Sequence, residues 1–396
     1  MRNNSFTITN LPNGGCHRGG VEFDGVYFNG HQPTHKHGKY FIVVGEIYYG
    51  DELFCVSMYE EYGNDFVNHL DGEFLVIIYD PSNQTIDFFT DPWATRQAHY
   101  TAGDFIYSFS TWPTKTSKSL KWNSHYQYSI GDNQLRLVNG EIYKWDLRQY
   151  KNTLEDMTIA FEEAVLKRYH DNMVLAFSGG MDSSCVALCL AENEKTFHSA
   201  HLSLVKIEDE NTISEVVEYT KPYNNFIRFD ELPEGVGTPN SETFYKAIHK
   251  VVPHFEILCM PGAADPLLDN DVYKGKFLDE FQIWPEDLTT IFPWTLFYGS
   301  RRVMNAREHQ SLRQNAYIMD TFRDRNLVQE WLNVTHTLKN KESKIMQREY
   351  LRKRHISIPT VIAGIGHQWD NEHGWGRRPA GGWAPLMKVH EIYSDI

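Results

Sequence analysis

The chain lacks the features of several common protein classes. No apolar run approaches the ~20 residues that span a bilayer, and the N-terminus M-R-N-N-S-F-T-I-T-N has no long apolar signal segment. The five cysteines include no C-x-x-C pair, and an odd number without a framework is typical of a reducing compartment. We therefore expect a cytoplasmic protein without a membrane partner.

Clusters with the spacing of metal ligands are also scarce. Cys185 and Cys189 lie four residues apart in an expected helix, either as metal ligands or as small buried residues on one face. The second interpretation is favoured, because free cysteine behaves as a small hydrophobic residue. His31, His35 and His37 could likewise form a metal site or lie in a solvated loop. The lack of nearby carboxylates or cysteines favours the solvated loop.

Basic residues are in the minority. Lysine and arginine total 38 against 52 aspartates and glutamates, and the net charge is −14. Proteins that hold nucleic acid need a basic surface for its phosphates. The balance therefore argues against a nucleic-acid partner, although residues 348–354 could form a local basic patch.

The most informative stretch that is present runs from Met173 to Leu190, M-V-L-A-F-S-G-G-M-D-S-S-C-V-A-L-C-L. Residues 173–177 predict a buried parallel strand. Gly179 and Gly180 allow the backbone to approach a ligand closely. A helix that opens directly after them directs free N–H groups and a positive dipole end at the turn. The order predicts a site for phosphate.

Polar side chains in this turn add to the prediction. Ser178, Ser183 and Ser184 supply hydroxyl donors, whereas Asp182 would repel phosphate unless a cation lay between them, which implies Mg²⁺. No Walker A pattern is present. The stretch resembles the S-G-G-x-D-S-S loop of the ATP pyrophosphatases, which bind the pyrophosphate of ATP. The alternative is an ordinary strand-to-helix turn of small residues.

The 396 residues divide into two patterns. Residues 1–150 contain short β-branched and aromatic segments with one expected helix at about 53–70, and residues 80–84 predict a hairpin turn. From residue 151, strands and helices alternate, which is typical of a doubly wound parallel α/β sheet. Beyond residue 293 the pattern is mostly helical.

Further stretches resemble the class B asparagine synthetases. Residues 45–48 (G-E-I-Y), 58–74 and 90–96 match motifs of the family's glutaminase domain, and residues 344–349 (K-I-M-Q-R-E) resemble its K-x-x-L-R-E helix. The resemblance implies an Ntn-hydrolase-like αββα sandwich, glutaminase-like, in residues 1–150. It implies an ATP-pyrophosphatase synthetase domain with extra helices in residues 151–396. β-Lactam synthetases share this architecture, so the substrate does not follow from it.

The glutaminase motifs depart from the family. The family requires an N-terminal cysteine, whereas this chain begins Met1-Arg-Asn and offers only Cys16 after two glycines, exposed if a propeptide were cleaved. Val44 replaces the asparagine that donates to the oxyanion, and loss of one such donor costs about 100- to 1000-fold. Glu46 is retained, either for function or as a strand-edge carboxylate. We expect an inactive glutaminase, as in the β-lactam synthetases.

The resemblance also implies a second metal ligand. C-M-P-G-A-A-D-P-L-L, starting at Cys259, is similar to the family's S-G-E-G-S-D-E-L-F, which makes Asp265 the partner of Asp182 for Mg²⁺. The alternative for Asp265 is a turn residue before a proline. Gly262 stands where asparagine synthetases have glutamate and β-lactam synthetases have tyrosine.

Three candidate catalytic residues follow from the resemblance. Y-I-M-D-T-F-R-D, residues 317–324, resembles the family's E-x-R-x-P-F-L-D, so Tyr317 or Asp320 would assist the nucleophile; a structural hydrogen bond is the alternative for both. Lys344 would stabilise charge on the α-phosphate. Its neighbours Lys339 and Lys341 are interpreted as solvated surface.

These residues predict an ATP-dependent ligase that forms amides. A substrate carboxylate attacks ATP to give an acyl-adenylate and pyrophosphate, and an amine or ammonia then displaces AMP. The alternatives are an asparagine synthetase, against which Val44 and Gly262 count, and a catalytically dead scaffold, against which the loop and Lys344 count. The sequence does not identify the acid or the amine. It also leaves open whether the reaction closes a ring and whether the protein forms a homodimer.

Overall fold

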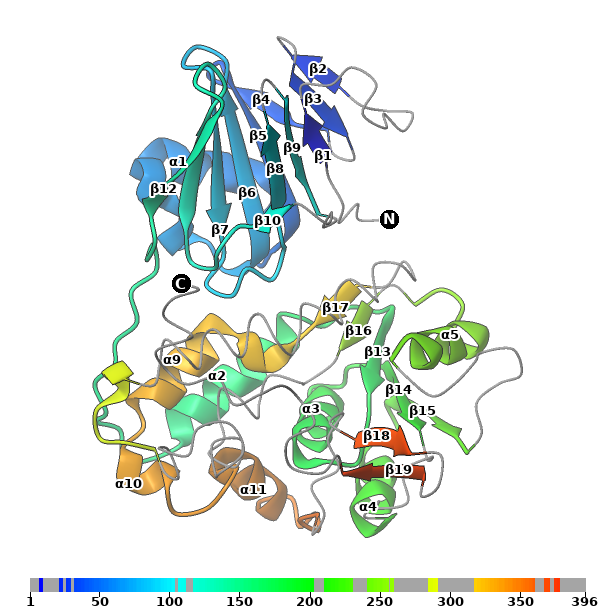
Figure 1. Ribbon diagram of the computed structural model, residues 1–396. Coiled ribbons are helices and arrows are strands. Elements are labelled where there is room, and N and C mark those ends of the chain that lie inside the picture. The colour runs from blue at the N-terminus through cyan, green and yellow to red at the C-terminus, as the bar shows by residue number, and fades with distance from the viewer. Residues whose placement is uncertain are drawn as a thin grey trace. The chain divides into compact units, whose positions relative to one another are not determined.

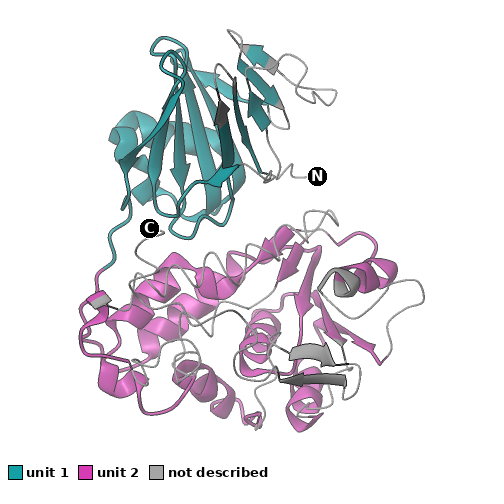
Figure 2. Ribbon diagram, viewed as in Figure 1, with its two compact units in different colours: residues 1–145 teal, residues 146–396 magenta. Residues whose placement is uncertain are grey.

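A computed structural model of the chain divides into two compact units, residues 1–145 and 146–396 (Figure 2). The structure describes residues 7–9, 21–23, 26–29, 32–103, 106–111, 117–202, 210–230, 241–255, 257–259, 284–290, 317–359, 367–370 and 374–377. None of the helices in these ranges is long and apolar enough to cross a membrane.

Unit 1 contains two six-stranded antiparallel sheets (Figure 1). The first has the order β10-β8-β9-β1-β3-β2, with β1 Thr7–Thr9, β2 Val21–Phe23, β3 Val26–Asn29, β8 His99–Gly103, β9 Ile106–Ser110 and β10 Lys118–Ser119. The second has the order β12-β11-β7-β6-β5-β4, with β4 Thr34–Lys36, β5 Lys39–Ile47, β6 Gly72–Asp80, β7 Thr85–Thr90, β11 His125–Ser129 and β12 Gln134–Asn139.

Strand alternation builds the two cores of unit 1. Along β5, Ile42 and Val44 join a cluster with residues of the other sheet, whereas Phe41 and Val43 join a cluster with α1. Helix α1 (Glu52–Tyr62) and the 3-10 helix η1 (Gly63–His69) cover that outer face (Figure 1). In the described part of unit 1 they form one helical layer, whereas the resemblance implied two.

Unit 2 is a mixed α/β structure around a five-stranded parallel sheet of order β15-β14-β13-β16-β17. Its strands are β13 Met173–Ala176, β14 Phe197–Leu202, β15 Asn224–Phe229, β16 Ile257–Cys259 and β17 Tyr317–Met319. The order reverses between β13 and β16, and open α/β sheets bind ligands at such a point, beyond the carboxyl ends of the strands.

The described helices of unit 2 lie partly beside this sheet and partly away from it (Figure 1). They are α2 Glu155–Leu166, α3 Met181–Glu192, α4 Glu210–Thr220, α5 Ser241–Val251, α9 Arg325–Asn333, α10 His336–Lys339 and α11 Ile345–Arg352, with the 3-10 turns η2 Leu288–Thr290 and η4 Thr321–Arg323. A separate hairpin pairs β18 (His367–Asp370) with β19 (Gly374–Arg377). Helix α3 follows directly on β13, so the predicted phosphate loop lies at the carboxyl edge of the sheet.

Candidate functional site

The loop at residues 178–180 connects β13 to α3 and requires glycine at its centre. Gly179 has φ +72°, a value that residues with a Cβ rarely adopt. A Cβ on Gly179 would also lie 2.5 Å from Cγ1 of Ile213 on α4. Gly180 is the N-cap of α3 in extended geometry. The predicted order of strand, glycine turn and helix is therefore confirmed.

Serine hydroxyls hold the loop in shape. Ser183 Oγ accepts a hydrogen bond from Ser178 N at 3.2 Å and donates to Gly180 O at 3.2 Å. Ser178 Oγ in turn accepts from Gly180 N at 3.3 Å. Two backbone N–H groups that could face an anion are thus satisfied by hydroxyls of the loop itself.

Ser184 differs from its neighbour. Its side chain is fully buried, and its Oγ has no hydrogen-bond partner among the described residues. Its backbone N–H donates to Gly180 O at 3.0 Å, an ordinary helical bond. Neither polar group of Ser184 is open to a ligand, so the structure gives no support to its predicted contact with pyrophosphate.

Asp182 meets Lys344 across 162 residues of sequence. Lys344 Nζ donates to Asp182 Oδ2 at 2.6 Å, and Gln347 Nε2 donates to Asp182 Oδ1 at 3.1 Å. The Lys344 side chain is 5% exposed and that of Asp182 is 16% exposed. The two residues that sequence motifs nominated separately therefore form one partly open ion pair beside the glycine loop.

The backbone of Lys344 is unusual. It has φ 52° and ψ 42°, in the left-handed region, and it is the N-cap of α11. Its carbonyl accepts a bond from Arg348 N at 2.9 Å. A non-glycine residue in this region is held there by its surroundings, and such residues concentrate at functional sites.

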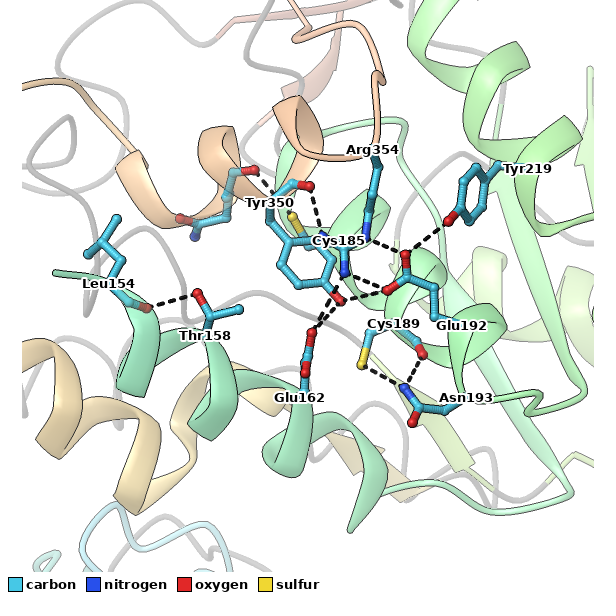
Figure 3. Close-up of polar contacts among 11 residues, drawn as sticks. Leu154, Thr158, Glu162, Cys185, Cys189, Glu192, Asn193, Tyr219, Tyr350 and Arg354 are labelled. Carbon is cyan, nitrogen blue, oxygen red and sulfur yellow. Dashed lines mark hydrogen bonds and ion pairs between the residues drawn. The ribbon is translucent and has the colours of Figure 1, made fainter.

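A polar network fastens α11 to α2 and α3 (Figure 3). Tyr350 Oη donates to Glu162 at 3.2 Å, and Arg354 forms a fork with Glu192, with Nε to Oε1 at 2.6 Å and Nη2 to Oε2 at 2.5 Å. Tyr219 of α4 also donates to Glu192, at 2.9 Å. Because the network joins the helix after Lys344 to the helix that carries Asp182, it fixes the ion pair.

The two cysteines of α3 are structural. Cys185 and Cys189 are fully buried, which confirms the favoured interpretation. Burial raises the pKa of the Cys189 thiol to about 12 and that of Cys185 well above its usual value. Within the described ranges, no group of three or more His, Cys, Asp or Glu residues could hold a metal.

The other predicted residues are not all brought to the loop. Asp320 lies at the carboxyl end of β17, fully buried, and accepts a bond from Phe322 N at 3.0 Å as the N-cap of η4. Tyr317 begins the same strand opposite Ile257, at the end of the sheet away from the loop. Asp265 and Gly262 lie outside the described residues.

Lys339 is a correction to the sequence interpretation. We expected solvated surface, but the side chain is buried against the rings of Trp284 and Trp331, each centred 5.2 Å from Nζ. It donates to Gln149 Oε1 at 2.9 Å and to Leu332 O at 3.0 Å. Burial lowers the pKa of its ammonium well below the usual value. Lys341, in contrast, is exposed as expected.

Sequence reasoning missed Gln347 and Arg323. Gln347 is almost fully buried and binds Asp182, and Arg323 is also buried. The signal was present, because each stands where the quoted family pattern has leucine, in K-x-x-L-R-E and in E-x-R-x-P-F-L-D.

The described residues of unit 1 that the sequence analysis singled out lie in the core or on exposed strands and turns. Val44 is packed between the two sheets. His35 and His37 are exposed, as expected, but the loop prediction is wrong for His35, which lies on β4; His37 is in the turn that follows and pairs with Glu60. Glu46 is half-buried on β5. Cys16 and His31 lie outside the described residues.

The donor set is compatible with a metal at Asp182. The carboxylate is a hard oxygen ligand, it is 16% exposed, and it accepts hydrogen bonds from Lys344 Nζ and Gln347 Nε2. Mg²⁺ is often held by one or two carboxylates, with water and substrate phosphates filling the rest. Asp182 therefore fits as one such ligand.

Sequence similarity to known proteins agrees with the motifs. A protein of Methanocaldococcus jannaschii named putative asparagine synthetase [glutamine-hydrolyzing] 1 is 26% identical over 163 residues, 35% of this chain and 30% of that protein. The asparagine synthetase [glutamine-hydrolyzing] of Asparagus officinalis is 26% identical over 230 residues, 48% of this chain and 38% of that protein. These matches confirm the resemblance to the asparagine synthetase superfamily, and the chain spans about a third of the length of both relatives.

Other comparisons add little. No protein-family model matches the chain. A glutamine phosphoribosylpyrophosphate amidotransferase from B. subtilis, complexed with ADP and GMP, aligns with a TM-score of 0.25 at 9% identity, over 59% of this chain and 60% of that chain. A structure of the allosteric regulatory enzyme of purine biosynthesis aligns with a TM-score of 0.21 at 8% identity, over 53% of this chain and 64% of that chain. Scores this low establish no shared fold.

Proposed function

We propose that the protein is an ATP-dependent ligase that adenylates a substrate carboxylate and transfers the acyl group to an amine or ammonia, releasing pyrophosphate and AMP. The observation that carries this proposal is the ion pair of Lys344 with Asp182 at 2.6 Å. It joins the lysine of a K-x-x-L-R-E-like helix to the carboxylate of an S-G-G-x-D-S-S-like loop, at the edge of the sheet where ligands bind.

The loop and α3 would hold the polyphosphate. The N-terminus of a helix offers N–H groups and a positive dipole end to an anion. The hydroxyls of Ser178 and Ser183 now satisfy N–H groups of the loop, and phosphate oxygens would replace them as acceptors. Asp182 would hold Mg²⁺, with Asp265 as the proposed second carboxylate. When bound, the metal would neutralise charge on pyrophosphate.

Lys344 would act on the reacting phosphate. Its ammonium is nearly buried, so a charge that develops near it is screened little by water. Asp182 holds it beside the loop, Gln347 binds the other oxygen of Asp182, and the network around Glu192 holds the helix. We propose that Lys344 stabilises negative charge on the α-phosphate in both half-reactions. No described geometry assigns such a role to Tyr317 or Asp320, whose predicted assistance to the nucleophile stays a proposal.

Unit 1 would not supply ammonia from glutamine. Val44, at the position of the oxyanion asparagine, is buried in the core between the sheets and has no hydrogen-bond donor in its side chain. The nucleophile would therefore be free ammonia or an amine on a substrate.

Exchange of labelled pyrophosphate into ATP tests the proposal. With Mg²⁺ and a panel of carboxylic acids, we expect exchange that depends on one class of acid, with AMP release only when an amine or ammonia is added. If no acid supports exchange and calorimetry detects no ATP binding, the proposal is wrong and a non-catalytic scaffold remains.

A second candidate, an asparagine synthetase, is favoured by the names of the sequence relatives. It predicts exchange with aspartate and formation of asparagine from ammonia. If glutamine also supplied the nitrogen, the proposal of an inactive glutaminase would be wrong.

A further inference from the structure

The side chain of Arg323 is buried, and its guanidinium has no partner among the described residues. Arg323 ends η4, and its side chain is 2% exposed. Its Nε and Nη1 are buried and make no hydrogen bond to any of the residues that the structure describes. An unpaired buried charge is destabilising, and no contact with the described residues offsets the cost of burying this guanidinium.

Other buried arginines in the described ranges have carboxylate partners. Arg96 Nη2 lies 3.2 Å from Glu73 Oε2, and Arg168 Nη1 lies 2.7 Å from Asp324 Oδ2. Asp324 follows Arg323 directly in sequence, but its carboxylate does not bind Arg323 among the described contacts. It accepts hydrogen bonds from the N-terminal turn of α9 instead. Arg96 and Arg168 are therefore neutralised by carboxylates, whereas no described carboxylate pairs with Arg323.

The position of Arg323 relates it to the proposed ATP site. Strand β17 is parallel to β16, with Met319 opposite Cys259, and Cys259 is in turn opposite Leu175 of β13. Thr321 Oγ1 lies 4.0 Å from Cys259 Sγ, so η4 starts at the carboxyl edge of the sheet. The phosphate loop leaves the same edge two strands away, about 10 Å. A small elongated ligand can span this distance.

The guanidinium is a feature of this chain and not of the pattern that it resembles. In E-x-R-x-P-F-L-D, the position of Arg323 is leucine, and the position of the arginine is held here by Met319, which is fully buried. The pattern has its positive charge at the position of Met319, whereas this chain has one four residues later, at the end of η4.

We propose that Arg323 binds a carboxylate of the acid substrate, one that is not itself adenylated. The inference rests on the proposed function, and it makes the acid at least a dicarboxylate. A planar guanidinium matches a carboxylate through paired hydrogen bonds. The phosphates of ATP would lie at the loop, two strands away, which leaves the second carboxylate of the acid as the anion within reach of Arg323.

Binding without nucleotide tests the proposal. Calorimetry at constant ionic strength would compare succinate, glutarate and adipate with uncharged succinamide and with inorganic phosphate. We expect at least one dicarboxylate to bind the wild-type protein, and Arg323→Leu to weaken it about 10- to 100-fold. Arg352→Leu is the control, because Arg352 is exposed and paired with Glu342. No binding of any dicarboxylate, or equal binding by Arg323→Leu, overturns the proposal.

Thermal unfolding separates a binding role from a structural one. Without ligand, Arg323→Leu should melt at the same temperature as the wild type or higher, whereas Arg168→Leu, which removes one of the two cations paired with the buried Asp324, should melt lower. A clear loss of stability in Arg323→Leu, with dicarboxylate binding intact in Arg323→Gln, means a structural role and overturns the proposal. Phosphate binding that depends on Arg323, without dicarboxylate binding, also overturns it.

The two proposals can fail separately. Pyrophosphate exchange with an unchanged KM for the acid in Arg323→Leu would refute the role of Arg323 and leave the ligase intact. Dicarboxylate binding that depends on Arg323, in a protein with no exchange, would refute the ligase and leave the anion site.

Discussion

Lys339 and Lys344 lie five residues apart, and both are buried, but their surroundings differ. Lys339 contacts two tryptophan rings and two neutral oxygen acceptors, and burial lowers the pKa of its ammonium. Lys344 pairs with the carboxylate of Asp182 and adopts a left-handed backbone beside the glycine loop. Burial alone does not identify a functional lysine; a charged partner at the edge of a ligand site does.

The contrast also explains what each lysine can contribute. Lys339 contacts the two rings, an amide side chain and a backbone carbonyl, so it joins the segment at Gln149 to α9 and α10. Asp182 is partly exposed, so Lys344 can exchange that partner for an incoming phosphate.

The largest expected effect is the loss of activity in Lys344→Met. Removal of a cation that stabilises charge in the transition state should lower the rate of pyrophosphate exchange by about 100- to 1000-fold. Circular dichroism should show an intact fold, because Gln347 still binds Asp182. Lys341→Met, three residues away and exposed, should retain activity. Near-normal turnover in Lys344→Met would remove the proposed role.

A smaller effect is expected for Gln347→Leu, which restores the residue of the family pattern. The change removes the 3.1 Å bond to Asp182 Oδ1 and leaves the lysine in place. Because groups that orient a metal ligand alter metal affinity by about 10-fold or more, the Mg²⁺ requirement of exchange should shift. The control is Gln134→Leu on the exposed strand β12. An unchanged Mg²⁺ requirement would argue against metal at Asp182.

Lys339→Met should change stability without changing exchange. The pKa of Lys339 is lowered in the folded state, so between that pKa and about 10.4 the unfolded chain binds more protons. Wild-type stability should therefore rise with pH across this window, by up to about 1.4 kcal/mol per pH unit relative to the variant. Urea unfolding from pH 7 to 10 measures the difference, and parallel curves would mean that the lysine is not perturbed.

The smallest effects compare two adjacent serines. Ser183→Ala removes the acceptor of Ser178 N and should lower stability by about 1 kcal/mol. Ser184→Ala removes a buried hydroxyl without a partner in the described structure, so it should be neutral or slightly stabilising. Exchange should weaken in the first variant and persist in the second. A strong loss of exchange in Ser184→Ala would restore its predicted contact with phosphate.

Local patterns predicted local structure well. The expected turn at residues 80–84 is present, because Asp80 Oδ1 accepts bonds from Ser82 N and Asn83 N and closes the hairpin between β6 and β7. The expected helix at 53–70 is instead α1 followed by a 3-10 helix. The reason is Gly63, which takes φ 57° and caps α1 through a bond to Tyr59 O.

The sequence by itself determined the strand, glycine turn and helix around Ser178, because hydrophobic runs and glycine act over a few residues. It also nominated Asp182 and Lys344 through resemblance. Folding, and not local sequence, brings these two residues together, places Tyr317 at the start of its strand away from the loop, and buries the Arg323 guanidinium without a partner among the described residues. Such facts depend on contacts between segments far apart in the chain.

The two lysines show the same limit. Lys344 was nominated only by resemblance to a family pattern, and Lys339 was expected in solvent. Its environment comes from Trp284 and Trp331, and that of Lys344 from Asp182. Charge and exposure are set by the groups that folding brings within a few ångströms, and no pattern of spacing along the chain specifies them.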